Sequence, residues 1–357
     1  LTNPASTVLK TNFNDLYNLI IDHATVVGKY TDNFVIANNL TINQGTFEAD
    51  AGDENLTVTG DVTVGDGTGS ANTAVLGHAD DTSAMTFGSL TIDSDGKYIA
   101  TSGTTTITSE NSSDGVCLRN NGTFTHNSGL VSIETQDHTT FVWSSASQRF
   151  NNLTVNLGAS ARVCTLSGQF DSHRYVEGDF TVTNCKFDTN NAGTFRIDGD
   201  VSLTSSATLT CGTSTCSFGS LSVASGTTYN ATSGTTTITK ANGGTDGRAF
   251  FIHGSATFTH NNGLVKFTAS SPQVAPTSTG QTSTSHPFYD LEQTTGTMQW
   301  KAEHHKVLNN CTMKGSAFNG STGNVHVLGI CRLTGETFNS GDTATNDNSF
   351  FQTLVIE

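Results

Sequence analysis

Two groups of acidic residues have the composition needed for hydrolytic chemistry. The first comprises Asp171, Glu177 and Asp179, and the second comprises Asp198 and Asp200. Two carboxylates held at a set distance across a glycosidic bond can cleave a polysaccharide. However, Gly-Asp occurs in the similar words EGDF, DGDV and TGDV, and Gly-Asp is a typical turn sequence. We therefore interpret these acids as turn residues and predict no catalytic residue.

Acidic phrases similar to calcium loops occur at two places, DSDGK from Asp93 and GDGTG from Gly65. Alternating carboxylates with a glycine suit oxygen coordination, but neither phrase continues to a glutamate at the EF-hand spacing. Glu303, His304 and His305 form one further cluster. Adjacent strand residues point to opposite faces, so these histidines would not share a metal. The sequence predicts turns here, with no metal ligand and no cofactor-binding residue.

Several other side chains have two interpretations. His126 and His260 stand in identical TFTHN words, and equivalent repeat positions are typical of structural turns. Aromatic side chains can stack on sugars if exposed or fill the interior if buried; those considered are Trp143, Trp300, Tyr175, Tyr229 and Tyr289. Asn-x-Ser/Thr sequons need an outward-facing asparagine to be modified; they occur at Asn39, Asn55, Asn111, Asn121, Asn152, Asn230, Asn310 and Asn319.

Much of the chain is an internal duplication. The stretch Phe87–Thr135 returns as Phe218–Ala269, and both copies contain FGSL, ATSGTTTIT and TFTHN. The offset is 131 residues between Phe87 and Phe218 and 134 between His126 and His260. The second copy therefore has a small insertion between shared words, and repeat proteins place such insertions in loops.

From about Phe34 onward, short segments alternate apolar and polar residues between Gly, Asn and Asp. This pattern is typical of strands joined by turns. Equivalent strand centres recur at a step of 17 residues, from Leu90 to Ile107 and from Ile107 to Phe124. Constant short steps favour a β-solenoid, in which each coil stacks on its neighbours, over a string of β-sandwiches. The predicted fold class is all-β, a repetitive parallel β-helix preceded by a short N-terminal α-helix.

That helix is predicted over residues 4–23, PASTVLKTNFNDLYNLIIDH. Pro and Ser near its beginning are helix start signals. Its large apolar residues have the spacing of a coiled-coil seam; they are Leu9, Phe13, Leu16 and Ile20, followed by Val27. The pattern fits either one amphipathic helix that caps the β body or a short bundle that sets a trimer.

The predicted organisation is a helical coupling or trimerisation segment over 1–35 and a β-solenoid over 36–357. The repeats divide the solenoid into units at about 39–150, 180–288 and 310–357. Two segments do not repeat, Asp137–Tyr175 and Ser270–Lys306. We expect specificity to lie in these two segments.

Composition restricts the possible partners. The net charge is −15, and an acidic protein repels a phosphate backbone, which argues against nucleic acid. No apolar run is long enough to cross a membrane. The seven cysteines contain no CxxC pair and no zinc spacing. We expect most of them to be buried, and a local disulfide between Cys211 and Cys216 is an alternative.

The words FGSLTI, ATSGTTTIT, GTFTHNSG and LTVTGDVTV resemble those of β-helical structural proteins of tailed bacteriophages, the tail fibres and tailspikes. The resemblance covers about residues 39–357. It implies a homotrimer on the virion surface that contacts other virion proteins and attaches to cell-surface glycans. No catalytic motif of that family matches a position here, so the resemblance implies a non-enzymatic structural protein.

Two alternatives remain open. Similar words occur in bacterial surface adhesins, so the chain is alternatively an adhesin or an extracellular filament subunit on the bacterial surface. A polysaccharide-depolymerising tailspike is the second alternative. All three hypotheses agree in expecting no cofactor, no nucleic acid and no insertion into a membrane.

Overall fold

The computed structural model describes residues 7–9, 16–31, 33–50, 53–144, 148–167, 175–244, 247–275, 286–300, 304–315, 317–320, 324–334, 337–339 and 350–357. These residues form two compact units, Leu1–Gly178 and Asp179–Glu357. Both units are parallel β-solenoids, with about 12 coils in all and no helix among the described residues. Within this part of the chain, no helix has the length and apolar character needed to span a bilayer.

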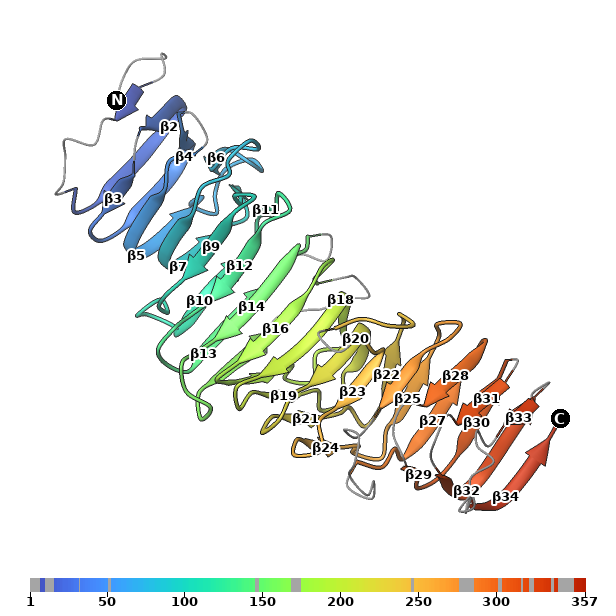
Figure 1. The fold of residues 1–357 in the computed structure, drawn as a ribbon. Helices are drawn as coiled ribbons and strands as arrows, with labels where there is room; N and C mark the ends of the chain where they lie inside the picture. The colour runs from blue at the N-terminus through green and yellow to red at the C-terminus, as the bar shows by residue number, and fades with distance from the viewer. Residues whose placement is uncertain are drawn as a thin grey trace. The chain divides into compact units, whose positions relative to one another are not determined.

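The first unit contains fifteen strands (Figure 1): β1 (Thr7–Leu9), β2 (Leu19–Tyr30), β3 (Phe34–Ile36), β4 (Leu40–Ala49), β5 (Leu56–Val64), β6 (Ala74–Leu76), β7 (Met85–Ile92), β8 (Gly96–Ile99), β9 (Thr104–Ile107), β10 (Val116–Asn120), β11 (Thr123–Thr125), β12 (Leu130–Ile133), β13 (Thr139–Trp143), β14 (Asn152–Asn156) and β15 (Val163–Ser167). Every pairing described within this unit is parallel. The strands form three ladders, β2-β4-β5-β7-β10-β13-β15, β2-β4-β6-β8-β11 and β3-β5-β7-β9-β12-β14. Each ladder is one side of the coil.

The second unit has the same construction (Figure 1). Its strands are β16 (Phe180–Thr183), β17 (Lys186–Asp188), β18 (Thr194–Thr204), β19 (Thr208–Thr210), β20 (Thr215–Val223), β21 (Thr228–Asn230), β22 (Thr235–Ile238), β23 (Phe250–Ile252), β24 (Thr257–Thr259), β25 (Leu264–Phe267), β26 (Gln273–Ala275), β27 (Asp290–Gln293), β28 (Thr297–Trp300), β29 (His304–Val307), β30 (Cys311–Lys314), β31 (Ala317–Gly320), β32 (Asn324–Thr334), β33 (Thr337–Asn339) and β34 (Phe350–Ile356). Long strands such as β18 and β20 bend and contribute to two ladders each.

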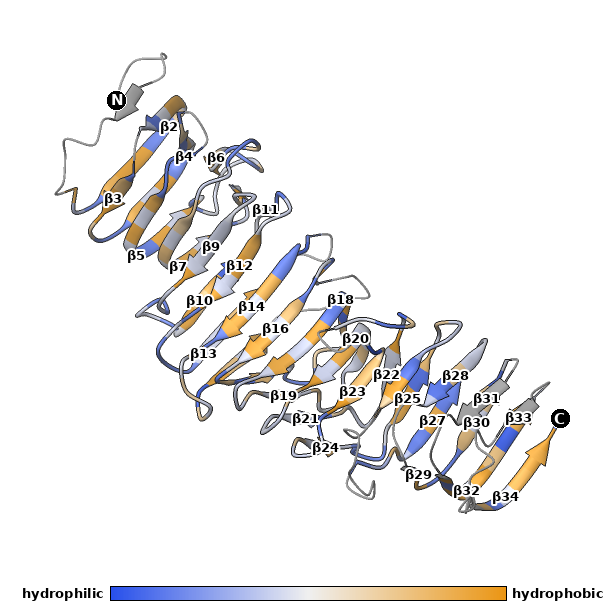
Figure 2. Ribbon diagram, in the orientation of Figure 1, coloured by the Kyte–Doolittle hydropathy of each residue, from blue (hydrophilic) through white to orange (hydrophobic). Residues whose placement is uncertain are grey.

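Alternation of side chains explains why these segments are strands. Along β18, every second residue is buried and the residues between are partly exposed. Successive strand residues point to opposite faces, so a period of two places one set in the interior of the coil. The strands consequently change between apolar and polar residues along their length (Figure 2). Threonine and serine, which suit a solvated β surface, occupy many of the outward positions.

In-register stacking builds the core from columns of like residues. One column of the first unit consists of Leu40, Val62, Leu90 and Leu118, which pair in this order. Each is at most 1% exposed. Burying one such side chain contributes about 1.5–3 kcal/mol before conformational entropy is subtracted. The core is therefore the sum of many similar contacts between neighbouring coils.

The two copies of the duplicated sequence keep one buried hydrogen bond. Tyr98 and Thr105 join their hydroxyl groups at 2.7 Å in the first unit. Tyr229 and Thr236 do the same at 3.0 Å in the second. The larger offset of the second copy falls between β22 and β23, so the insertion is in a loop as predicted.

The predicted N-terminal helix is not supported. Its last five residues, Leu19–His23, begin strand β2. Leu19 and Ile21 pair with the inward-facing Leu40 and Ile42 of β4, so the ladder satisfies their backbone groups and buries Ile21. Ile20, assigned to the helical seam, faces outward and is 66% exposed. Pairing with the next coil overrides the weak helical spacing; residues 4–6 and 10–15 of the prediction lie outside the described residues.

Candidate functional site

The Gly-Asp words have one structural role in both units. In the first unit, Asp61 Oδ1 accepts a hydrogen bond from Ser89 Oγ at 2.6 Å. In the second, Asp200 Oδ1 accepts one from Ser220 Oγ at 2.9 Å. Each serine is the register partner of its aspartate in the next coil. These aspartates therefore join neighbouring coils, which supports a structural interpretation of the acidic words.

Asp200 has two further partners. Lys240 Nζ lies 2.9 Å from its Oδ1, and the backbone N–H of Gly244 donates to its Oδ2 at 2.7 Å. Both partners come from the loop that carries the insertion of the second copy. Burial opposes ionisation of Asp200, but the hydrogen bonds from Lys240, Gly244 and Ser220 outweigh it and lower the pKa of this carboxyl.

Replacing Asp200 with alanine is expected to destabilise the second unit by about 2–3 kcal/mol, because three donors lose a charged acceptor. A depressed folded pKa gives stability that is present above the unfolded pKa of about 3.9 and is lost as the pH falls through the folded value. Urea unfolding across this pH range should therefore show a smaller loss of stability on acidification in the variant. Asp61→Ala is the matched control, and an equal effect of both variants would contradict the role of Lys240 and Gly244.

The remaining acidic candidates are also bound. Glu177, in the first unit, forms ion pairs with Arg149 and with Nε2 of His126, the latter at 3.4 Å. In the second unit, Asp198 accepts a hydrogen bond from Arg196 Nε at 2.8 Å. Asp179 Oδ1 likewise accepts one from the backbone N–H of Asp200 at 2.9 Å. Asp171 lies outside the described residues.

The two calcium-like phrases contact each other. Asp95 of DSDGK is 1% exposed, and its carboxylate accepts the backbone N–H of Gly67 in GDGTG at 2.8 Å. The N–H of Asp66 and the hydroxyl of Thr73 approach the other oxygen at 3.4 and 3.5 Å. Gly65 has φ +95°, and a Cβ there would lie 2.4 Å from the carboxylate. Hydrogen-bond donors thus surround this carboxylate, whereas a cation site needs oxygen ligands.

No group of His, Cys, Asp or Glu residues able to hold a metal ion occurs among the described residues. His305 is buried in β29, and its ring lies 4.0 Å from the ring of Trp300. Glu303 lies outside the described residues. His126 and His260 have equivalent turn roles, since each Nδ1 accepts the backbone N–H of the residue two positions later, at 2.9 and 3.0 Å.

Four of the five aromatic candidates are buried. Trp143, Trp300, Tyr175 and Tyr229 are at most 7% exposed, so they are interior residues. Tyr289 is partly exposed and stacks on His260 with ring centroids 5.5 Å apart. All seven cysteines are buried and free, as expected for most of them, and Cys211 and Cys216 are not bonded to each other.

Two sequon asparagines are used inside the fold. Asn39 Oδ1 accepts the backbone N–H of Asp61 at 2.9 Å. Asn55 Oδ1 accepts that of Ala84 at 2.8 Å. Each bond joins neighbouring coils, so a glycan at either asparagine would have to be accommodated beside the stack.

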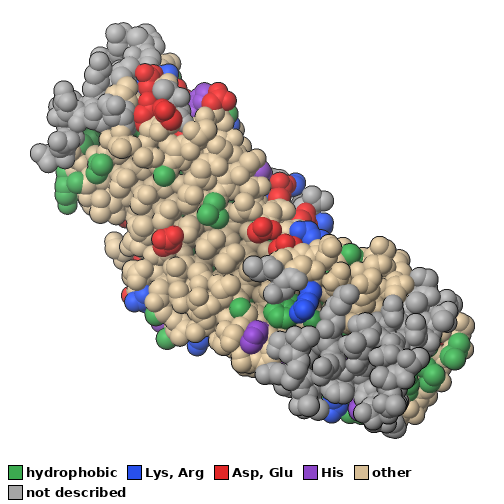
Figure 3. Space-filling model, viewed as in Figure 1, with side chains coloured by type: hydrophobic (Ala, Val, Ile, Leu, Met, Phe, Trp, Pro, Cys, Tyr) green, Lys and Arg blue, Asp and Glu red, His purple; other side chains and the backbone are tan. Residues whose placement is uncertain are grey.

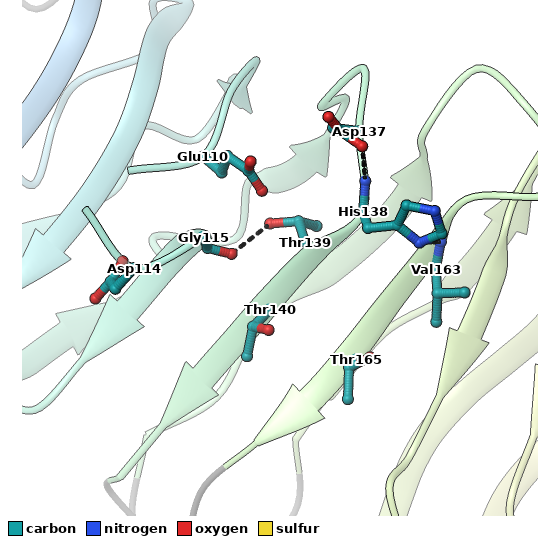
Figure 4. Close-up of a pocket in the computed structure, with 9 residues that line it drawn as sticks. All are labelled: Glu110, Asp114, Gly115, Asp137, His138, Thr139, Thr140, Val163 and Thr165. Carbon is teal, nitrogen blue, oxygen red and sulfur yellow. Dashed lines mark hydrogen bonds between the residues drawn. The ribbon is translucent and has the colours of Figure 1, made fainter. Parts of the chain in front are cut away.

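An open groove of about 400 Å³ lies on the first unit (Figure 4). We call it the Glu110 groove. Three residues come from the loop between β9 and β10, and six come from β13, β15 and the residues before β13. They are Glu110, Asp114, Gly115, Asp137, His138, Thr139, Thr140, Val163 and Thr165. The last six belong to the non-repeating segment Asp137–Tyr175.

Hydrogen bonds hold the walls of the Glu110 groove. The backbone N–H of Val163 donates to His138 Nδ1 at 3.2 Å, and the N–H of His138 donates to Asp137 Oδ1 at 2.7 Å. Thr140 and Thr165 are register partners on neighbouring strands (Figure 4). Asp114 forms an ion pair with Arg119, whereas no partner of the Glu110 carboxylate is found among the described residues. The groove therefore offers carboxylates and hydroxyl groups to a polar ligand.

No protein-family model matches this chain, and no curated protein or solved structure does. The chemistry of the Glu110 groove therefore has to be argued from its own residues. Sequence reasoning did not identify this groove, although it singled out the segment that supplies most of it. Glu110 and Asp137 are separated by 27 residues, and only the stacking of coils brings their segments to one place.

Asp81 is a buried acid that no proposed site uses. It is fully buried, and its Oδ1 accepts the N–H of Ser83 at 3.0 Å and the hydroxyl of Ser83 at 2.5 Å. Its Oδ2 is buried without a partner among the described residues. Burial raises the pKa of Asp81, although the hydrogen bonds from Ser83 oppose the shift.

Asp81→Asn is expected to stabilise the first unit by about 1 kcal/mol at neutral pH, because it removes a poorly solvated charge and keeps an acceptor for Ser83. A raised folded pKa gives stability that is complete below the unfolded pKa of about 3.9 and is lost as the pH rises through the folded value. Thermal unfolding of the variant should therefore weaken less over this rise in pH. Parallel pH profiles for the two proteins would contradict the prediction.

Proposed function

We propose that this chain is a non-enzymatic structural protein of the fibre, spike or decoration type on the surface of a virion, where it forms a homotrimer and attaches to cell-surface glycans. The observation that carries the proposal is the division of labour within the first unit. Repeated coils supply the scaffold, and the Glu110 groove draws six of its nine residues from a segment that does not repeat. The resemblance of the repeated words to phage tail fibres and tailspikes supplies the virion context.

The chemistry of the Glu110 groove suits a hydroxyl-rich ligand. Carboxylates accept hydrogen bonds from sugar hydroxyl groups, and threonine hydroxyl groups both donate and accept them. The groove also has a rigid base, because Thr140 and Thr165 stand on paired strands. Functional groups on rigid elements lose little entropy when a ligand binds.

The absence of proposed catalysis rests on the use of the acidic candidates. Asp179, Asp198, Asp200 and Glu177 all bind cations or backbone donors of the scaffold. A glycosidase needs one carboxyl to donate a proton and another to accept one or attack. On the face shown in Figure 3, acidic and basic side chains are scattered between wide uncharged areas, as suits adhesion through many neutral contacts.

Binding to a panel of immobilised bacterial surface polysaccharides tests the attachment role. We expect the intact chain to bind at least one of them, and the double variant Glu110→Ala/Asp137→Ala to bind at least tenfold more weakly. Asp80→Ala is the matched control, because the Asp80 side chain is 91% exposed and lies outside the groove. Equal binding by all three proteins would contradict attachment through the groove.

Three further measurements separate the alternatives. Release of oligosaccharides from a bound polysaccharide would favour the depolymerising tailspike. Immunogold labelling of cells instead of particles would favour the adhesin or filament subunit. A monomeric mass in light scattering would overturn the homotrimer.

A further inference from the structure

Two cysteines of the second unit occupy one column of the core. Cys311 of β30 and Cys331 of β32 are register partners in neighbouring coils. Both are free, and they are 0% and 2% exposed. In a parallel ladder, paired residues stand about 4.8 Å apart and point in the same direction. This separation falls within the Cα separation of about 4.4–6.8 Å found in disulfides.

We propose that Cys311 and Cys331 are a site of oxidative modification, at which a peroxide converts the two thiols into a disulfide between neighbouring coils. The thiol of Cys331 is oxidised to a sulfenic acid, and the peroxide leaves as water. The sulfur of Cys311 then attacks the sulfenic sulfur, and the released hydroxide takes the thiol proton of Cys311 to form a second water. One peroxide is reduced for each disulfide formed.

The two thiols are unequal, which assigns their roles. The hydrogen bond from Cys311 lowers the pKa of Cys331. The same contact, followed by burial, raises the pKa of Cys311 well above its ordinary value. The thiolate is the form that peroxides oxidise, so Cys331 reacts first and Cys311 resolves the sulfenic acid.

Access also favours this pair. The partner of Cys331 on its other side is Leu354 of β34, which is 45% exposed. Among the described strands, β34 pairs only with β32. A strand held on one edge opens more readily than one held on both, and its opening would uncover Cys331.

A second cysteine pair provides an internal control. Cys211 and Cys216 are both 0% exposed, and Cys216 stands in β20, which pairs with β18, β22 and β23. Burial, followed by the contact with Cys211, raises the pKa of Cys216 well above its ordinary value. This pair has neither an open edge beside it nor a thiol of lowered pKa in Cys216, so it should oxidise more slowly.

Peptide mapping after treatment of the intact reduced chain with hydrogen peroxide tests the proposal. The protein is then denatured in an alkylating agent and digested with trypsin. Trypsin cuts at Lys306, Lys314 and Arg332, so the two cysteines fall in separate peptides, 307–314 and 315–332. We expect these peptides to become joined while the peptide 197–240, with Cys211 and Cys216, is still doubly alkylated.

Alkylation of both Cys311 and Cys331 after oxidation, or earlier bridging within peptide 197–240, would overturn the proposal. Cys331→Ala should leave Cys311 alkylated, and Cys216→Ala should leave the new bridge intact. Thermal unfolding gives an independent readout, in which peroxide raises the unfolding temperature of the wild type and dithiothreitol reverses the rise. The mapping of the wild type decides the matter even where a variant fails to fold.

Discussion

Replacing Trp143 with alanine is expected to lower the free energy of unfolding of the first unit by about 3–5 kcal/mol. Trp143 is 1% exposed, and its ring centroid lies 4.5 Å from that of Phe150 and 5.2 Å from that of Phe124. Its indole N–H donates to the carbonyl of Gln148 at 3.2 Å. The variant therefore loses a cluster of aromatic contacts and leaves a cavity that a coil held on both sides cannot close.

Denaturant unfolding followed by circular dichroism measures this loss, and hydrogen exchange locates it. Amide protection should fall first in β13 and β14, the strands that carry or adjoin the cluster. Tyr17→Ala is the control, because Tyr17 is 64% exposed and should contribute little. A loss below about 1 kcal/mol for the tryptophan variant would show that the neighbouring coils collapse into the space.

Asp95→Ala is expected to destabilise the same unit by about 3 kcal/mol, because it removes the charged acceptor of a buried loop. Gly67 loses its bond of 2.8 Å, and the N–H of Asp66 is left facing an apolar methyl group. The glycine at Gly65, where a Cβ would meet the carboxylate, cannot refill the gap. Thermal unfolding is the first measurement.

Two controls sharpen this prediction. Asp66→Ala changes an acid of the same loop whose Oδ1 binds only the N–H and hydroxyl of Thr68, and we expect little effect. Calcium and chelator should leave the unfolding temperature of the wild type unchanged, because donors already occupy the Asp95 carboxylate. A rise with calcium would contradict this role and restore the metal hypothesis.

The period-two pattern was sufficient to predict the strands and the parallel solenoid. An inward column such as Leu40, Val62 and Leu90 is visible in the sequence because each coil repeats the same environment. The helix prediction was wrong at Leu19–His23, because a seam of two heptads is weak evidence beside a ladder partner at Leu40–Ile42.

The polar contacts were harder to predict. Asp95 and Gly67 are separated by 28 residues, and Asp200 and Gly244 by 44. Such pairs depend on which loops lie above one another, and loop length varies from coil to coil. The phrases around Asp95 and Gly65 were both identified, but a turn motif carries no signal of its partner. The Glu110 groove was missed for the same reason.

The in-register ladder has a genetic consequence. Each described coil needs only a matching column above and below it, as Asp61 with Ser89 and Asp200 with Ser220 illustrate. Recombination between the similar words FGSLTI and FGSLSV would remove or add whole coils without changing those columns. The length of such a protein can thus vary in steps of complete coils between related genomes, while loops such as the one carrying Lys240 diverge independently.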